Sequence, residues 1–135
     1  MRSFDASRER SAPSTLVGTT NDGGGWSLDV RRMTLVVAVK PHCDGCRSFL
    51  ESDLAEFANV EVVFVAAATD EEYRVSSHDV VVAPSLMVEL EIRAAPFYVL
   101  IDPSVSRVVA EGTLFNTIQV ASEIASFVTS KPDQM

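Results

Sequence analysis

Two cysteines three positions apart are the residues whose type and spacing most directly suggest chemistry. They are Cys43 and Cys46, the only cysteines among 135 residues. One pair cannot form a scaffold of several disulfides. In a reducing compartment, a close pair is typical of thiol–disulfide exchange, redox sensing or binding of a soft metal ion. The pair therefore predicts a thiol-based site.

The segments around the pair predict a strand, a helix and a second strand. A nearly continuous apolar run over residues 33–39 is typical of a strand buried on both faces, and Pro41 ends it. Apolar residues recur at helical spacing over 43–57, and a second apolar run follows at 60–67. Such a unit has parallel strands joined by a right-handed crossover. The cysteines then lie where the first strand leads into the helix.

This placement predicts different roles for the two thiols. The N–H groups at a helix start would stabilise a thiolate at Cys43, which we expect to be the attacking group. Cys46, one turn along, could attack a mixed disulfide at Cys43 and so resolve it. As a cation His42 would favour the Cys43 thiolate and Asp44 would oppose it, so both are expected to tune Cys43. For His42, an exposed loop residue with no such role is the alternative.

The rest of the chain predicts an α/β fold, a mixed sheet of four or five strands flanked by helices. Asn116 and Gln119 have the spacing of a capping box at the start of a last helix. The other expected elements are a short helical turn within 69–78, an extended piece at 80–83, a helix from Pro84, and strands at 96–102 and 107–111.

Composition and the chain ends bound the remaining possibilities. The formal net charge is −8 with scattered Lys and Arg, which disfavours nucleic acid and membrane surfaces as partners. No apolar run is long enough to span a bilayer. The first ten residues lack the apolar region of a secretory signal, so a cytoplasmic location is expected. We expect a disordered tail at 1–25, one domain at 26–130 and a short tail at 131–135.

With these elements in order, the sequence resembles the thioredoxin-like superfamily over residues 30–129. Three features carry the resemblance: Cys43-Asp44-Gly45-Cys46 after the first apolar strand, Arg93-Ala94-Ala95-Pro96-Phe97 before the third, and a hairpin over 97–111 followed by the last helix. The step from Ile92 to Pro96, and the Ile101-Asp102 strand end, resemble the thiol-disulfide reductase branch.

The resemblance implies a thiol-disulfide oxidoreductase. It would exchange its dithiol or disulfide with a protein or small-thiol partner, and it would use an external electron donor or acceptor and no bound cofactor. Pro96 would be a cis-proline facing the cysteine pair, and Ala95 would offer backbone groups to an extended substrate. The sequence departs from thioredoxin at His42 (Trp there), at Asp44-Gly45 (Gly-Pro) and at Val37 (a buried Asp). The proton acceptor for Cys46 would then be His42, Asp44 or water.

Two other functions stay open at this point. The cysteine motif followed by a helix also resembles the copper-binding heavy-metal-associated domains, and two thiolates suit Cu(I). Those domains are shorter, and they place Met where this chain has Pro41. A zinc site would need more ligands than the pair, so no metal ligands are assigned. The third possibility is a non-catalytic interaction domain that holds a partner at Ala95 and Pro96.

Overall fold

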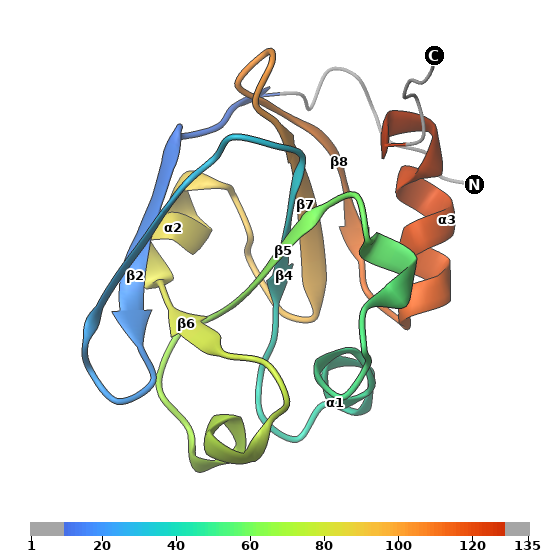
Figure 1. Ribbon diagram of the computed structural model, residues 1–135. Coiled ribbons are helices and arrows are strands. Elements are labelled where there is room, and N and C mark those ends of the chain that lie inside the picture. Colours follow the sequence, from blue (N-terminus) through green and yellow to red (C-terminus); the bar gives the residue numbers. More distant parts are fainter. Residues whose placement is uncertain (1–9, 129–135) are drawn as a thin grey trace.

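The central strands of the structure are the most apolar segments of the chain. The computed structural model describes residues 10–128, and its strands form one mixed sheet (Figure 1). Strand β4 (Thr34–Ala38) is buried along its whole length and pairs in parallel with β5 (Glu61–Ala66). On its other side β4 pairs antiparallel with β7 (Phe97–Asp102), which forms a hairpin with β8 (Arg107–Thr113). The expected strand–helix–strand unit and hairpin are confirmed.

The sheet order is β1-β8-β7-β4-β5-β6-β2-β3. The remaining strands are β1 (Arg10–Ser11), β2 (Thr15–Thr20), β3 (Gly25–Asp29) and β6 (Val80–Val82). The helices are α1 (Asp44–Leu50), α2 (Pro84–Glu89) and α3 (Thr117–Val128), with short 3₁₀ helices η2 (Ala55–Phe57) and η3 (Glu71–Val75).

Helices cover both faces of the sheet because alternate residues of β4 point to opposite sides. Leu35 and Val37 belong to the buried cluster that includes Phe49 of α1 and Ile124 of α3. Val36 and Ala38 belong to the second cluster, which includes Leu86 and Met87 of α2. Figure 1 shows α1 and α3 on one side of the central strands and α2 on the other. The α/β architecture expected from the sequence is therefore confirmed, with eight strands in place of four or five.

The expectation of a disordered tail at 1–25 is wrong for residues 10–25. Strand β2 pairs with β3 and with β6, and β1 pairs with β8. Leu16 is fully buried in the α2-side cluster. Gly18, which looks like part of a flexible linker, is needed for close packing, since a Cβ there would lie 2.6 Å from Val81 Cγ1 and 2.8 Å from the Val82 carbonyl oxygen. Residues 1–9, and the expected tail at 131–135, lie outside the described residues.

The helix expected over 43–57 is shorter than predicted. Helix α1 ends at Leu50, and Leu54 has a left-handed backbone with φ 59° before η2 begins. The Ser52 hydroxyl accepts from the Leu54 N–H, and the Asp53 carboxylate accepts from the Ala55 N–H. Such side-chain bonds compete with helical bonds and end the helix early. The Asn116–Gln119 capping box is confirmed, with the Gln119 N–H donating to Asn116 Oδ1 at 2.8 Å.

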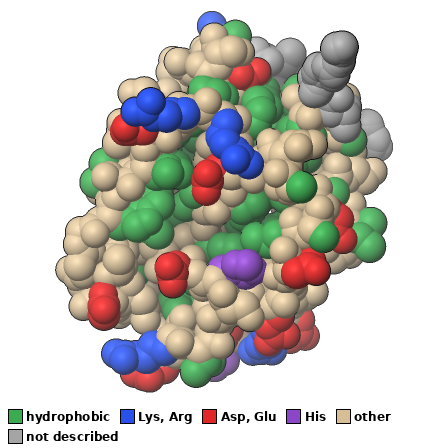
Figure 2. All heavy atoms as spheres, viewed as in Figure 1, with side chains coloured by type: hydrophobic (Ala, Val, Ile, Leu, Met, Phe, Trp, Pro, Cys, Tyr) green, Lys and Arg blue, Asp and Glu red, His purple; other side chains and the backbone are tan. Residues whose placement is uncertain are grey.

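The visible surface carries charges of both signs. On the face drawn in Figure 2, Lys and Arg side chains lie apart from one another among Asp and Glu, without a continuous basic patch. Within residues 10–128, no helix has the length and apolarity required to cross a membrane.

Candidate active site

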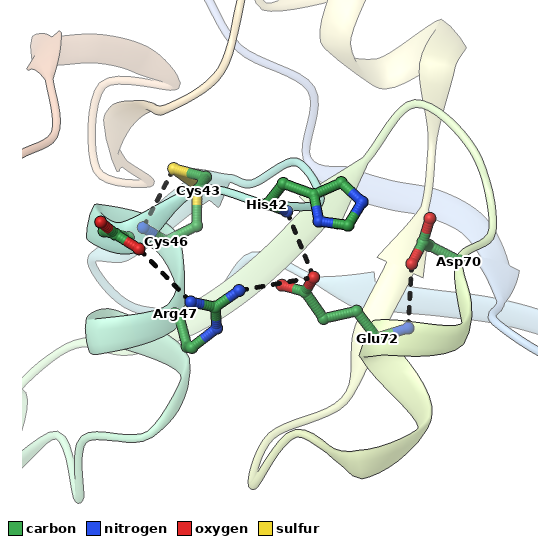
Figure 3. Close-up of polar contacts among 7 residues, drawn as sticks. His42, Cys43, Cys46, Arg47, Asp70 and Glu72 are labelled. Atoms are coloured by element: carbon green, nitrogen blue, oxygen red, sulfur yellow. Dashed lines mark hydrogen bonds and ion pairs between the residues drawn. A yellow bond between two sulfur atoms is a disulfide. The ribbon is translucent and has the colours of Figure 1, made fainter.

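The cysteine motif lies in the turn that leads from β4 into α1 (Figure 3). His42 has a left-handed backbone with φ 59°, which reverses the chain before the helix. Cys43 is extended, with φ −123° and ψ 114°, and is the N-cap residue of α1. Cys46 falls in the first turn of that helix. The structure therefore places the pair at the strand-to-helix junction, as the sequence predicted.

The two cysteines are joined in a disulfide and differ in how far each residue is buried. The Cα atoms of Cys43 and Cys46 are 5.2 Å apart. Cys43 is 8% exposed and Cys46 is 0% exposed, so Cys43 is the less buried of the two cysteines. The Cys43 sulfur accepts from the Cys46 N–H at 3.2 Å. A donor so placed favours the thiolate form of Cys43 once the disulfide is reduced.

The Pro96 loop lies at the same end of the sheet as the cysteines. The antiparallel register pairs Ala38 at the end of β4 with Phe97 at the start of β7. The Ala95–Pro96 peptide bond is cis, as the resemblance implied. The Pro96 carbonyl accepts from the Leu114 N–H at 3.4 Å. Leu114 also lies close to α1, since a Cβ added at Gly45 would be 3.5 Å from the Leu114 carbonyl oxygen. Leu114 therefore contacts both Pro96 and the helix that carries Cys46.

The backbone of Ala95 is open to a further strand. Ala95 is half-buried, and it lies just outside β7. Among residues 10–128 neither its N–H nor its C=O has a hydrogen-bond partner. An extended chain could use both groups by strand addition.

The charged neighbours of the pair form a small network (Figure 3). Arg47 lies 3.3 Å from an Asp44 carboxylate oxygen and 3.8 Å from Glu72 Oε1. The same Glu72 oxygen accepts from the backbone N–H of His42 at 3.2 Å. The His42 ring is exposed and points away from the Cys43 sulfur (Figure 3). Tuning of Cys43 by His42 and Asp44 stays a prediction.

Sequence reasoning missed Arg47 and Glu72. Glu72 belongs to η3 in the connection from β5 to β6, where the sequence shows only a polar stretch. Its contact with His42 joins residues 30 positions apart, so no local pattern reveals it. Val37, at the position of the thioredoxin Asp, is fully buried among apolar side chains. It supplies no proton acceptor for Cys46.

A resident metal has few candidate ligands here. Within the described part of the chain, no group of three or more His, Cys, Asp and Glu side chains is arranged to hold an ion. The cysteine pair alone could supply two sulfur ligands, and only after reduction.

The fold is thioredoxin-like. The chain is similar to the thioredoxin domain of a thiol-disulfide oxidoreductase from Bacteroides vulgatus, with a TM-score of 0.64 and 18% identity over 89% of this chain and 96% of that one. It is also similar to StoA from Bacillus subtilis, with a TM-score of 0.61 and 16% identity over 84% and 98%. A third similar structure is a DsbF homologue from Corynebacterium diphtheriae. Its TM-score is 0.62, with 15% identity over 93% of this chain and 91% of that one.

The sequence comparisons add no family assignment. No protein-family model matches this sequence, and no curated protein matches it significantly. The likeness to solved structures therefore establishes the fold, and the function rests on the site.

Proposed function

We propose that this protein is a thiol-disulfide oxidoreductase that exchanges electrons through Cys43 and Cys46. One observation carries the proposal: a disulfide at the start of α1, in which Cys43 is the less buried residue and Cys46 is fully buried, lies at the sheet end that also bears cis-Pro96. The similar structures named as a thiol-disulfide oxidoreductase domain, StoA and a DsbF homologue support it.

The reaction proceeds in two exchanges. In the reductive direction, the Cys43 thiolate attacks one sulfur of a partner disulfide, and the other partner sulfur leaves as a thiolate. Cys46 then loses its proton and attacks Cys43, which releases the second partner sulfur and forms the Cys43–Cys46 disulfide. Two electrons and two protons pass to the partner. The reverse sequence oxidises a partner dithiol, and an external thiol or disulfide resets the pair.

The substrate contact is proposed at Ala95 and Pro96. The open N–H and C=O of Ala95 would pair with an extended segment that carries the reacting cysteine. A protein thiol or disulfide, or a small thiol, is the proposed partner. Such a segment would bring its reacting cysteine to Cys43, the less buried of the two cysteines.

Single-cysteine variants test the assigned roles. Reduced Cys46→Ser should accumulate mixed disulfides with oxidised glutathione and with insulin, because Cys43 is the less buried of the two cysteines. Reduced Cys43→Ser should react at least about tenfold more slowly, since the Cys46 sulfur is buried. Adducts are counted by intact mass. Both variants should react alike in urea, where burial is lost.

Equal trapping by the two folded variants would contradict the assigned roles. A wild-type protein whose cysteines never form a reversible disulfide would contradict the function as a whole. Tight Cu(I) binding by that same protein would then favour the metal-binding alternative.

The cytoplasmic location stays a prediction of the sequence. Rapid alkylation of intact cells tests it, since a cytoplasmic pair should be largely reduced.

A further inference from the structure

Glu72 contacts the cysteine turn from a distant part of the chain. It lies on η3, between β5 and β6, and its Oε1 accepts from the His42 N–H at 3.2 Å. That oxygen is also 3.8 Å from the Arg47 guanidinium. The second oxygen, Oε2, is buried and has no hydrogen-bond partner within residues 10–128. A carboxylate is thus held against both flanks of the pair, His42 before Cys43 and Arg47 after Cys46 (Figure 3).

A chain of hydrogen bonds holds Glu72 in this place. The Asp70 side chain accepts from the Glu72 N–H at 2.9 Å and caps η3. The backbone of Asp70 is in turn bonded in both directions to the Asn21 side chain, at 3.1 and 3.2 Å. Asn21 lies in the turn between β2 and β3. The N-terminal hairpin therefore supports the loop that carries Glu72.

The contacts with His42 and Arg47 have separate consequences. A left-handed backbone is unfavourable for a residue such as His42 and persists only where its surroundings hold it. The bond to the Glu72 carboxylate holds it, and so places Cys43 at the N-cap. The pairing with Arg47 offsets a positive charge one residue after Cys46. The charged side chains of the network beside the turn are Asp44, Arg47 and Glu72, and the His42 ring points away from the Cys43 sulfur.

We propose that Glu72 is a positioning residue that holds the Cys43–Cys46 turn and keeps its reduction potential low. The inference rests on the proposed oxidoreductase function and assigns that site a further residue. The sign follows from charge. Negative charge near the pair disfavours the Cys43 thiolate, and it also offsets Arg47, which favours the thiolate. With Glu72 ionised, the reduced form is less stable and the disulfide is favoured.

Glu72→Gln separates charge from position. The amide oxygen can still accept from the His42 N–H, whereas the negative charge is gone. The equilibrium with glutathione should shift toward the dithiol by at least about threefold. This corresponds to a reduction potential about 14 mV less negative than that of the wild type. Alkylation of Cys43 should also extend to lower pH. Glu72→Ala, which loses the acceptor as well, should add a change in Cys43 reactivity through the released turn.

Glu71→Gln is the matched control. Glu71 is the neighbour of Glu72 on η3, is exposed, and pairs with Arg74 instead of the cysteine turn. It loses the same charge and should leave the equilibrium and the alkylation profile unchanged. Far-UV circular dichroism confirms that each variant is folded.

The outcomes distinguish this inference from the proposed function. A reversible two-electron transition in the wild type, with a shift in Glu72→Gln alone, supports it. A reversible wild type in which Glu72→Gln has no shift, or the same shift as Glu71→Gln, overturns the inference and leaves the oxidoreductase function standing. A wild type without any reversible transition overturns both.

Discussion

Leu16→Ala tests whether the N-terminal hairpin is part of the folded unit. Leu16 in β2 is fully buried and packs in the cluster shared with α2. Replacing a fully buried Leu by Ala removes apolar contacts and leaves a cavity, at a cost of about 2–5 kcal/mol. We expect about 3 kcal/mol here. In a domain of this size, this lowers the melting temperature by roughly 12 °C.

The single tryptophan makes the assay specific. Trp26 lies in β3, opposite Gly18 of β2, so its fluorescence reports on the hairpin. Far-UV circular dichroism reports on the whole sheet and its helices. Urea unfolding of the oxidised protein followed by both probes should give one coincident transition, as a cooperative unit requires. In Leu16→Ala both curves should move to lower urea together.

Val17→Ala is the control, because Val17 is the next residue of β2 and its side chain is 61% exposed. Its cost should stay within about 0.5 kcal/mol. The reasoning is refuted if Leu16→Ala unfolds at the wild-type urea concentration. It is equally refuted if Trp26 fluorescence changes well before the circular dichroism. In either case the hairpin would not share the core that the structure assigns to it.

Two further predictions concern ionisation and helix capping. Burial, followed by the charges of Asp70 and Glu72, raises the pKa of Tyr73 to about 12 from the ordinary value of 10.0. The folded state therefore binds this proton more tightly, so the stabilisation is complete below pH 10 and is lost as pH rises toward 12. In Tyr73→Phe, the free energy of unfolding from urea titrations should fall less between pH 10 and 12 than in the wild type. The absorbance difference between the wild type and Tyr73→Phe reports ionisation of Tyr73, and a midpoint near pH 10 would contradict the raised pKa. Asn116→Ala removes the acceptor for the Gln119 N–H and should cost about 1 kcal/mol by urea unfolding, and an unchanged midpoint would argue against the capping box.

Local patterns in the sequence were enough to predict the centre of this protein. The apolar runs that became β4, β5 and β7 are long and uninterrupted, because strands buried on both faces need apolar residues at every position. The cysteine spacing and the Asn116–Gln119 box are likewise contained within a few neighbouring residues. The cis state of the Ala95–Pro96 bond came from the family resemblance and is confirmed.

Only the tertiary structure decided the edge of the sheet and the surroundings of the cysteines. Strand β2 has one fully buried apolar residue, Leu16, and it is held by pairing with β3 and β6, which no local periodicity encodes. From the sequence alone Gly18 is typical of a flexible linker, and only the packing of Val81 against it shows why a side chain is excluded there. Glu72 reaches His42 only because the connection after β5 folds back beside the start of α1. Contacts between distant segments depend on how the chain packs, and they carry no signature in the residues that flank each partner.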